Sequence, residues 1–201
     1  MNSSSYGPSS ADARARPAPK GAALVVGASG GIGGALVEAL VGSGQFERVY
    51  AASRSGPVSA PSNPQVYGCD VDITRDDSCA ALSEFLGNEG VRLDAVLCVS
   101  GLLSDPSRTP PILPEKRLED IEPDALLDSF AVNAVGPLLL AKHVLGHLRS
   151  DARTVFAALS ARVGSISDNR LGGWYAYRMA KAALNMGIRT LSREAARRRP
   201  R

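Results

Sequence analysis

Short apolar runs recur along the chain after residue 20 and predict five buried strands. The first run, Ala22–Val26, stops abruptly at a glycine. Comparable runs follow, and we expect four more strands at residues 49–52, 66–71, 93–99 and 154–159. Runs that are short and apolar at successive positions are typical of strands covered on both faces of a sheet. The pattern therefore indicates a parallel sheet in the interior of the fold.

Helical spacing of apolar residues fills the intervals between these strands. Ile32, Leu36, Val37 and Leu40 predict a helix over residues 32–41. We expect further helices at residues 76–86, 123–148 and 175–198. The helix over 123–148 should bend at Gly136–Pro137, because proline cannot donate a backbone hydrogen bond. Strands that alternate with helices form βαβ units, so the sequence predicts an α/β fold with one Rossmann-type, doubly wound parallel sheet.

The first 20 residues differ from the remainder in composition. They are rich in Ser, Pro, Ala and Arg and contain one acidic residue. Such a segment has too little apolar content to pack against a core, and we expect a disordered tail. A cleavable organelle transit peptide is the alternative, because Ser and Arg richness with few acids is typical of one. The folded domain is then residues 21–201, and the expected location is cytoplasmic, or an organelle under the alternative.

Composition excludes several classes of protein. The 201 residues, 44% hydrophobic, suit one domain of ordinary size. The net charge of +3 is small and several arginines crowd residues 193–201, which argues against a nucleic-acid-binding face. No apolar run approaches the ~20 residues of a membrane span. Three cysteines without C-x-x-C spacing indicate reduced thiols and no metal site.

A glycine-rich segment lies between the first strand and the first helix, where a phosphate-binding loop would be. Gly27 permits a tight turn, Gly31 lets a pyrophosphate approach the backbone, and Gly33 allows close packing of helix on strand. Free N–H groups at the helix start would face the anion. The predicted dinucleotide-binding loop consists of Gly27, Ser29, Gly31, Ile32 and Gly33.

Two residues at the end of the second strand bear on the choice of cofactor. Ser53 and Arg54 lie about 20 residues after the glycine loop, where an acidic side chain would hold the ribose 2′-hydroxyl of NAD(H). A guanidinium there can instead pair with a 2′-phosphate. The sequence favours NADP(H) over NAD(H).

Tyr177 and Lys181 have the Y-x-x-x-K spacing. Residues four apart lie on one helix face, one turn from each other. An ammonium in that position is expected to lower the pKa of the phenol, so that Tyr177 exchanges a proton with a carbonyl or alcohol oxygen near neutral pH.

These motifs together resemble the short-chain dehydrogenase/reductase family. The resemblance rests on the glycine spacing, on Asp72-Ile73-Thr74, on Asn133 in FAVNAVGP, and on the run from Leu159 to Asn185, which is similar to that of C-factor-like carbonyl reductases. It covers residues 21–195. It implies hydride transfer between nicotinamide and a carbonyl carbon, a small carbonyl or alcohol substrate, and a homodimer or homotetramer.

The resemblance also implies roles for individual residues. Tyr177 would donate the proton, and Lys181 would lower its pKa and hold the nicotinamide ribose. Asn133 would complete the catalytic set, bending its helix and holding a water in a proton relay. Asp72 and Ile73 would flank the adenine ring. Ser100 and Gly101, after the fourth strand, would let the cofactor approach closely.

The sequence departs from the family pattern at the catalytic serine. Alignment on Gly164 places Ala161 in the usual serine position, with Ser160 immediately before it. Ser165 lies twelve residues before Tyr177, close to the family's usual separation. We assign the role to Ser160 and keep Ser165 as the alternative.

The chain ends at Arg201, before the C-terminal strands and substrate loop that the resemblance implies. We therefore expect a fragment of a longer reductase, or else a natural short form. A catalytically silent nucleotide-binding or interaction subunit is the competing function. No chemical role follows for Pro114-Glu115-Lys116, and Trp174 with Tyr175 would either line a substrate pocket or pack the preceding loop onto its helix.

Overall fold

Five parallel strands form one sheet in a computed structural model, which describes residues 21–54 and 63–198. The sheet order is β3-β2-β1-β4-β5, and every neighbouring pair is parallel. The order reverses between β1 and β4, which opens a crevice beyond the carboxyl ends of these two strands. The strands are β1 (Ala22–Val26), β2 (Arg48–Ser53), β3 (Val66–Asp70), β4 (Leu93–Cys98) and β5 (Val155–Ala158).

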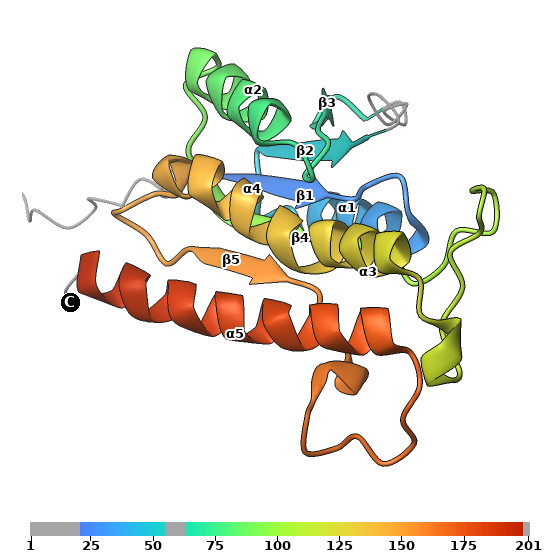
Figure 1. Cartoon of the computed structure of the whole chain (residues 1–201). Coiled ribbons are helices and arrows are strands. Elements are labelled where there is room, and N and C mark those ends of the chain that lie inside the picture. The colour runs from blue at the N-terminus through green and yellow to red at the C-terminus, as the bar shows by residue number, and fades with distance from the viewer. Residues whose placement is uncertain (1–20, 55–62, 199–201) are drawn as a thin grey trace, which may run out of the picture.

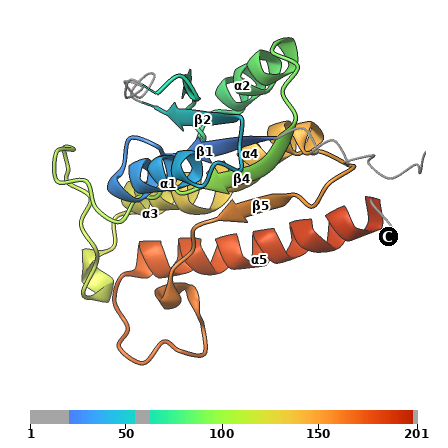
Figure 2. The same cartoon turned by 180° about the vertical axis from the view of Figure 1, so that it is seen from behind.

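Helices cover both faces of the sheet, as Figures 1 and 2 show from opposite sides. One face packs against α1, through a cluster that includes Val25, Val37 and Ala51. The larger core lies on the other face, where Leu86 and Leu140 meet the sheet. This arrangement confirms the predicted doubly wound Rossmann-type fold. The helices are α1 (Gly31–Gly42), α2 (Asp76–Asn88), α3 (Pro123–Phe130), α4 (Gly136–Val144) and α5 (Tyr175–Arg198), with short 3-10 turns η1 (Leu118–Asp120), η3 (Leu145–His147) and η4 (Arg162–Gly164).

The long helical segment between β4 and β5 is interrupted earlier than the sequence predicted. A π-helical turn, η2 (Ala131–Val135), joins α3 to α4, whereas the bend expected from proline was at Gly136–Pro137. The turn contains Asn133, where the family resemblance implied a bend. The position follows from the chemistry of proline. Pro137 has no N–H for the carbonyl four residues earlier, so the turn that loosens is the one before it, and Gly136 donates to the Ala131 carbonyl instead. The turn carries Asn133 at its centre.

The same segment is apolar enough to resemble a membrane span. Residues Pro123–His147 are long and apolar enough to cross a membrane by length and composition alone, with a mean hydropathy of 1.3 in their most apolar window. Leu140 and Val144 from this segment are fully buried in the core beside the sheet. Packing inside the fold therefore accounts for part of its apolar composition, since 39% of that window is buried. The predicted tail at residues 1–20 lies outside the described residues.

Burial predicts opposite outcomes for two leucines of this helical segment. Leu140 is fully buried, whereas Leu127 is 68% exposed. We expect Leu140→Ala to lower the free energy of unfolding by about 2–5 kcal/mol, because it leaves a cavity in the core. Leu127→Ala should change it by about 0.5 kcal/mol or less. Urea unfolding of both variants checks this, and equal midpoints would contradict the described packing.

Candidate active site

A cleft of about 530 Å³ lies at the carboxyl ends of the central strands. It is lined by residues that follow β1, β2, β3 and β4, at the point where the strand order reverses. Eight of the residues predicted to bind the cofactor line this one cleft, although they are spread over 75 positions of the chain. They are Gly27, Ser29, Ser53, Arg54, Asp72, Ile73, Ser100 and Gly101.

The glycine turn is held by contacts too close for a side chain. Gly27 has a φ of +93°, and a Cβ there would lie 2.7 Å from the Ser100 backbone nitrogen. A Cβ on Gly33 would lie 2.1 Å from the Gly27 carbonyl oxygen. Both positions therefore require glycine, which agrees with the predicted tight turn and close helix–strand packing.

The start of α1 is open at this turn. Its N-cap, Gly30, has no side chain to accept a hydrogen bond, and the first turn contains no acidic residue. A Cβ on Gly31 would meet no atom within 4 Å, and Ile32 is 58% exposed. The first N–H groups of a helix have no partner within the helix, so this end suits an anion.

Arg54 lies among carboxylates at the far side of the cleft. The pKa of Asp72 is lowered: burial raises it, but hydrogen bonds from the Thr74 hydroxyl (2.6 Å) and amide (2.9 Å) and the charge of Arg54 outweigh burial. Hydrogen bonds from Ser107, helped by the charges of Arg108 and Arg54, likewise lower the pKa of Asp105. The positive charge of Arg54 therefore lies close to both carboxylates at the edge of the cleft.

Asn133 is completely buried and connects the long helix to the floor of the cleft. Its Oδ1 accepts a hydrogen bond from the Leu102 amide at 3.1 Å, and its Nδ2 donates to the Leu102 carbonyl at 2.7 Å. A Cβ on Gly101 would lie 3.3 Å from Asn133 Oδ1 and 3.8 Å from Lys181 Nζ. Three of the predicted site residues thus meet at Gly101, which lines the cleft, whereas Asn133 and Lys181 lie behind it and are not among the lining residues.

Lys181 is only 2% exposed, and its ammonium donates to the Leu159 carbonyl at 2.8 Å. Burial lowers its pKa, an effect that Cys98 partly offsets. Its Nζ lies 5.5 Å from the centre of the Tyr177 ring. The pKa of Tyr177 is raised, by burial. The expected lowering by the ammonium is therefore wrong for this structure, because the ammonium is held by Leu159 and the half-buried phenol is desolvated.

The two candidate serines have different surroundings. The Ser160 hydroxyl is buried and has no hydrogen-bond partner among residues 21–54 and 63–198. The Ser165 hydroxyl lies 3.4 Å from the Ser167 hydroxyl and 3.4 Å from the Asp168 amide, within its own loop. A buried hydroxyl without a partner costs free energy and is typical of a functional position. This contrast favours Ser160.

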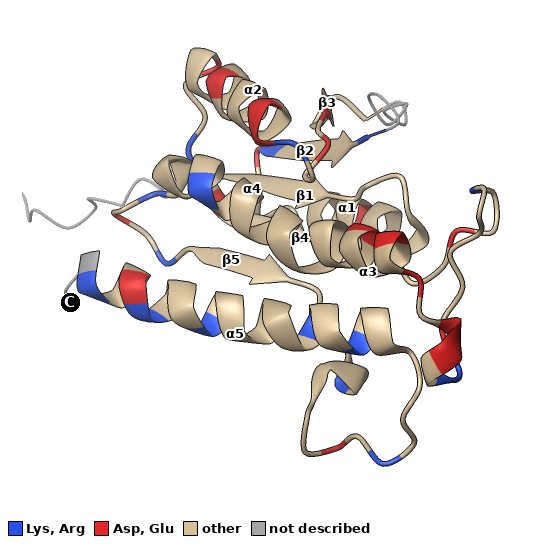
Figure 3. Cartoon of the chain, in the orientation of Figure 1, with Lys and Arg blue, Asp and Glu red and all other residues tan. Residues whose placement is uncertain are grey.

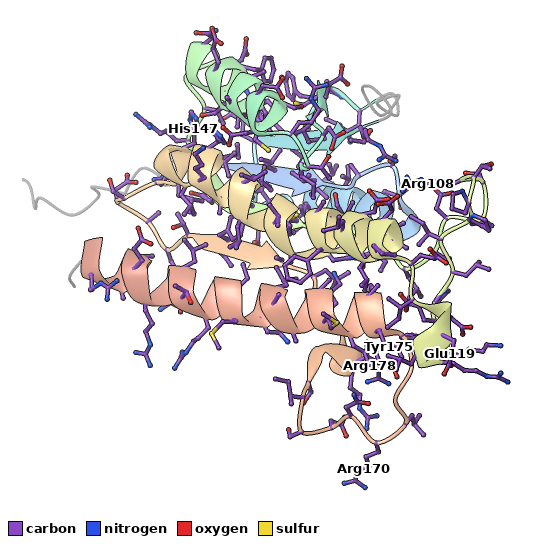
Figure 4. All side chains as sticks on the ribbon, in the orientation of Figure 1. Arg108, Glu119, His147, Arg170, Tyr175 and Arg178 are labelled. Atoms are coloured by element: carbon purple, nitrogen blue, oxygen red, sulfur yellow. The ribbon has the colours of Figure 1, made fainter. Side chains whose placement is uncertain are left out.

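Sequence reasoning missed several charged residues around the site. Asp105, Arg108 and Asp128 line the cleft, and Arg108, labelled in Figure 4, forms an ion pair with Asp128 of α3. Glu115 is buried against the start of α5. All but Asp128 belong to the proline-rich segment before α3, which has no periodicity that would predict inward-facing charges.

A second cleft, of about 660 Å³, lies at the opposite end of the sheet. It is lined by residues at the amino ends of the strands, among them Ala22, Arg48 and Arg92, and by none of the predicted site residues. The larger cavity is therefore separate from the predicted chemistry.

The sheet order, the glycine turn at its switch point and the adjoining Tyr–Lys helix define a Rossmann-type α/β domain. The chain belongs to the short-chain dehydrogenase/reductase family, because the family model for short chain dehydrogenase matches residues 21–199. This confirms the resemblance found in the sequence.

Individual proteins that resemble this chain support the same family assignment. The chain is 33% identical, over 81% of its length, to 1-hydroxy-2-glutathionyl-2-methyl-3-butene dehydrogenase from Rhodococcus sp. (strain AD45), and covers 66% of that protein. It is 43% identical to the C-signal of Myxococcus xanthus over 37% of this chain and 45% of that one. A carbonyl reductase from Pseudomonas aeruginosa PAO1 in complex with NADP superposes with a TM-score of 0.71 at 25% identity, over 87% of this chain and 76% of that one. The chain thus spans about half to two thirds of the curated relatives.

The close contact at Gly33 makes a prediction about stability. Gly33→Ala should lower the free energy of unfolding by about 1–3 kcal/mol, because the new methyl group meets backbone atoms that cannot move aside. Gly31→Ala should change it by about 1 kcal/mol or less, since the added carbon enters open space. Thermal unfolding without added nucleotide compares the two. A larger loss in Gly31→Ala would show that the turn is built differently.

Proposed function

We propose that this chain is the cofactor-binding and catalytic part of an NADP(H)-dependent oxidoreductase that reduces a carbonyl compound to an alcohol. The proposal rests mainly on the position of Gly101. This residue lines the cleft and lies against both Asn133 and the Lys181 ammonium. Family membership and the NADP complex of the similar carbonyl reductase support it.

The start of α1 and the adjoining cleft fit a dinucleotide. The start of α1 presents backbone N–H groups without an acidic neighbour, which suits a pyrophosphate. Asp72 and Ile73 line the cleft beside β3, where they would flank an adenine ring. Gly101 leaves the floor of the cleft free of a side chain on the side of Lys181. These residues would hold the cofactor in an extended form across the switch point.

Tyr177 is the proton donor in this proposal. The phenol is protonated at neutral pH and can give its proton to a carbonyl oxygen. Burial raises its pKa and so makes it a weaker acid, and the transfer therefore needs a positive charge nearby. When bound, a nicotinamide cofactor supplies the hydride that joins the carbonyl carbon. The Lys181 ammonium then compensates the phenolate that remains. The unpaired Ser160 hydroxyl is free to donate a hydrogen bond to the same oxygen.

Arg54 supports NADP(H) as the cofactor. It lies at the end of β2 and lines the cleft. Its neighbours Asp72 and Asp105 would repel the 2′-phosphate, so the guanidinium has to outweigh them. A charge-assisted hydrogen bond to a phosphate contributes about 1.5–3 kcal/mol.

Replacing the phenol tests the catalytic role. We expect Tyr177→Phe to lower kcat for NADPH oxidation with a panel of aldehydes and ketones by at least about 100-fold, because the proton donor is lost. The affinity for NADPH should stay within about threefold, since the aromatic ring is retained. Equal rates in the variant and the wild type would refute catalysis by Tyr177 and favour the silent nucleotide-binding subunit.

Replacing the guanidinium tests the cofactor. Arg54→Ala should weaken NADPH binding by about tenfold and leave NADH binding little changed, because only NADPH carries the 2′-phosphate. Calorimetric titration of both cofactors measures the ratio. Arg153→Ala, which removes an exposed arginine outside the cleft, is the matched control. An unchanged NADPH-to-NADH ratio in Arg54→Ala would contradict the assignment.

A further inference from the structure

Glu115 is a buried acidic residue in a segment to which the sequence assigned no chemistry. We propose that Glu115 is a positioning residue, which fixes the first turn of α5 and so holds the Tyr177 phenol in place. The effect on catalysis rests on the proposed role of Tyr177, whereas the hold on α5 is independent of it. Glu115 contacts α5 at Ala176, which lies 61 positions later in the chain.

Burial of this carboxylate requires compensation. Glu115 is 5% exposed, and within the described residues no Lys, Arg or His nitrogen lies within 4 Å of its carboxylate oxygens. An unpaired buried charge is costly, so some other group must face it. Both carboxylate oxygens lie 3.4 Å from the Ala176 amide nitrogen, in the first turn of α5. The carboxylate therefore faces the positive end of the helix dipole and one of its unpaired N–H groups.

The chain enters α5 through an unusual backbone conformation. Gly172, Gly173 and Trp174 have φ angles of +64°, +65° and +53°. Among the described residues Trp174 is the only one other than glycine with a positive φ. This conformation is strained for a bulky residue and persists only where the surroundings hold it.

Glu115 provides that hold through its backbone as well as its side chain. The Trp174 amide donates to the Glu115 carbonyl at 2.5 Å. A Cβ on Gly173 would lie 3.2 Å from the same carbonyl oxygen, so the two segments are in close contact. On the helix side, Arg178 Nε donates to the Gly173 carbonyl at 2.9 Å. The left-handed entry is thus fixed from both sides. Figures 3 and 4 show the segment around η1 beside the first turns of α5, near Tyr175 and Arg178.

Tyr177 is in contact with the turn that Glu115 fixes. Tyr177 follows Ala176, and its ring packs edge-on against Trp174, with ring centroids 6.5 Å apart at 74°. The phenol is therefore placed by the turn that Glu115 fixes. Since a misplacement of about 1 Å can cost about 100-fold in rate, loss of the Glu115 carboxylate should affect turnover without any contact with the reacting atoms.

Trp174 is the only tryptophan in the chain, so its fluorescence reports on this turn alone. The experiment compares the wild type with Glu115→Ala, Glu115→Gln and the control Glu119→Ala. Glu119 is exposed, four residues further along the same segment. We expect Glu115→Ala to shift the Trp174 emission to the red and to speed its quenching by acrylamide. The same variant should lower kcat by at least about tenfold and leave the KM for NADPH within about twofold.

Glu115→Gln keeps an oxygen that can accept from the Ala176 amide but loses the charge, so intermediate values are expected. Glu119→Ala should match the wild type. If circular dichroism shows that Glu115→Ala does not fold, Glu115→Gln decides, and wild-type quenching and kcat in that variant would overturn the proposal. Unchanged Trp174 fluorescence in a folded Glu115→Ala, or changed fluorescence with unchanged kcat, also overturns it. A wild type without turnover would refute the proposed function, while the fluorescence comparison would still test the hold on α5.

Discussion

The structure depends on one contact, the approach of the Gly33 backbone to the Gly27 carbonyl at the end of β1. Only because neither residue carries a side chain does α1 begin directly above the carboxyl ends of β1 and β4. That position leaves the first N–H groups of the helix facing the crevice where the strand order reverses. The anion-accepting end of the helix and the cleft lined by Arg54 and Asp72 therefore form one continuous surface.

The chemistry at the other end of the cleft depends on buried polar groups that are held by backbone atoms. Lys181 is fixed by the Leu159 carbonyl and Asn133 by the backbone of Leu102. The phenol of Tyr177 is half-buried, and burial raises its pKa. Because a raised pKa weakens the phenol as an acid, the proposed proton transfer depends on the buried Lys181 ammonium nearby to stabilise the phenolate.

Much of the fold could be predicted, since the run Ala22–Val26 and the helix from Tyr175 to Arg198 have the same limits in the structure as in the sequence pattern. The glycine loop was predictable from the spacing of its glycines, because a side chain at Gly27 or Gly33 would clash with neighbouring backbone atoms. Proline chemistry alone placed the irregular turn too late, at Gly136–Pro137, because the effect of a proline is felt in the turn before it, whereas the resemblance had implied a bend at Asn133. The position of Glu115 could not be predicted, because its burial depends on contact with a helix start 61 positions away. The two serines could be separated only by the partners that the fold supplies.

Amide NMR during titration with NADPH shows where the dinucleotide binds, because the two clefts lie at opposite ends of the sheet. If it binds over the glycine turn, the largest shifts occur at Gly31, Ile32, Gly33 and Gly101. Shifts concentrated at Gly90 and Arg149, which line the larger cleft, would contradict binding over the glycine turn. The absence of any shift with either NADPH or NADH would contradict it as well.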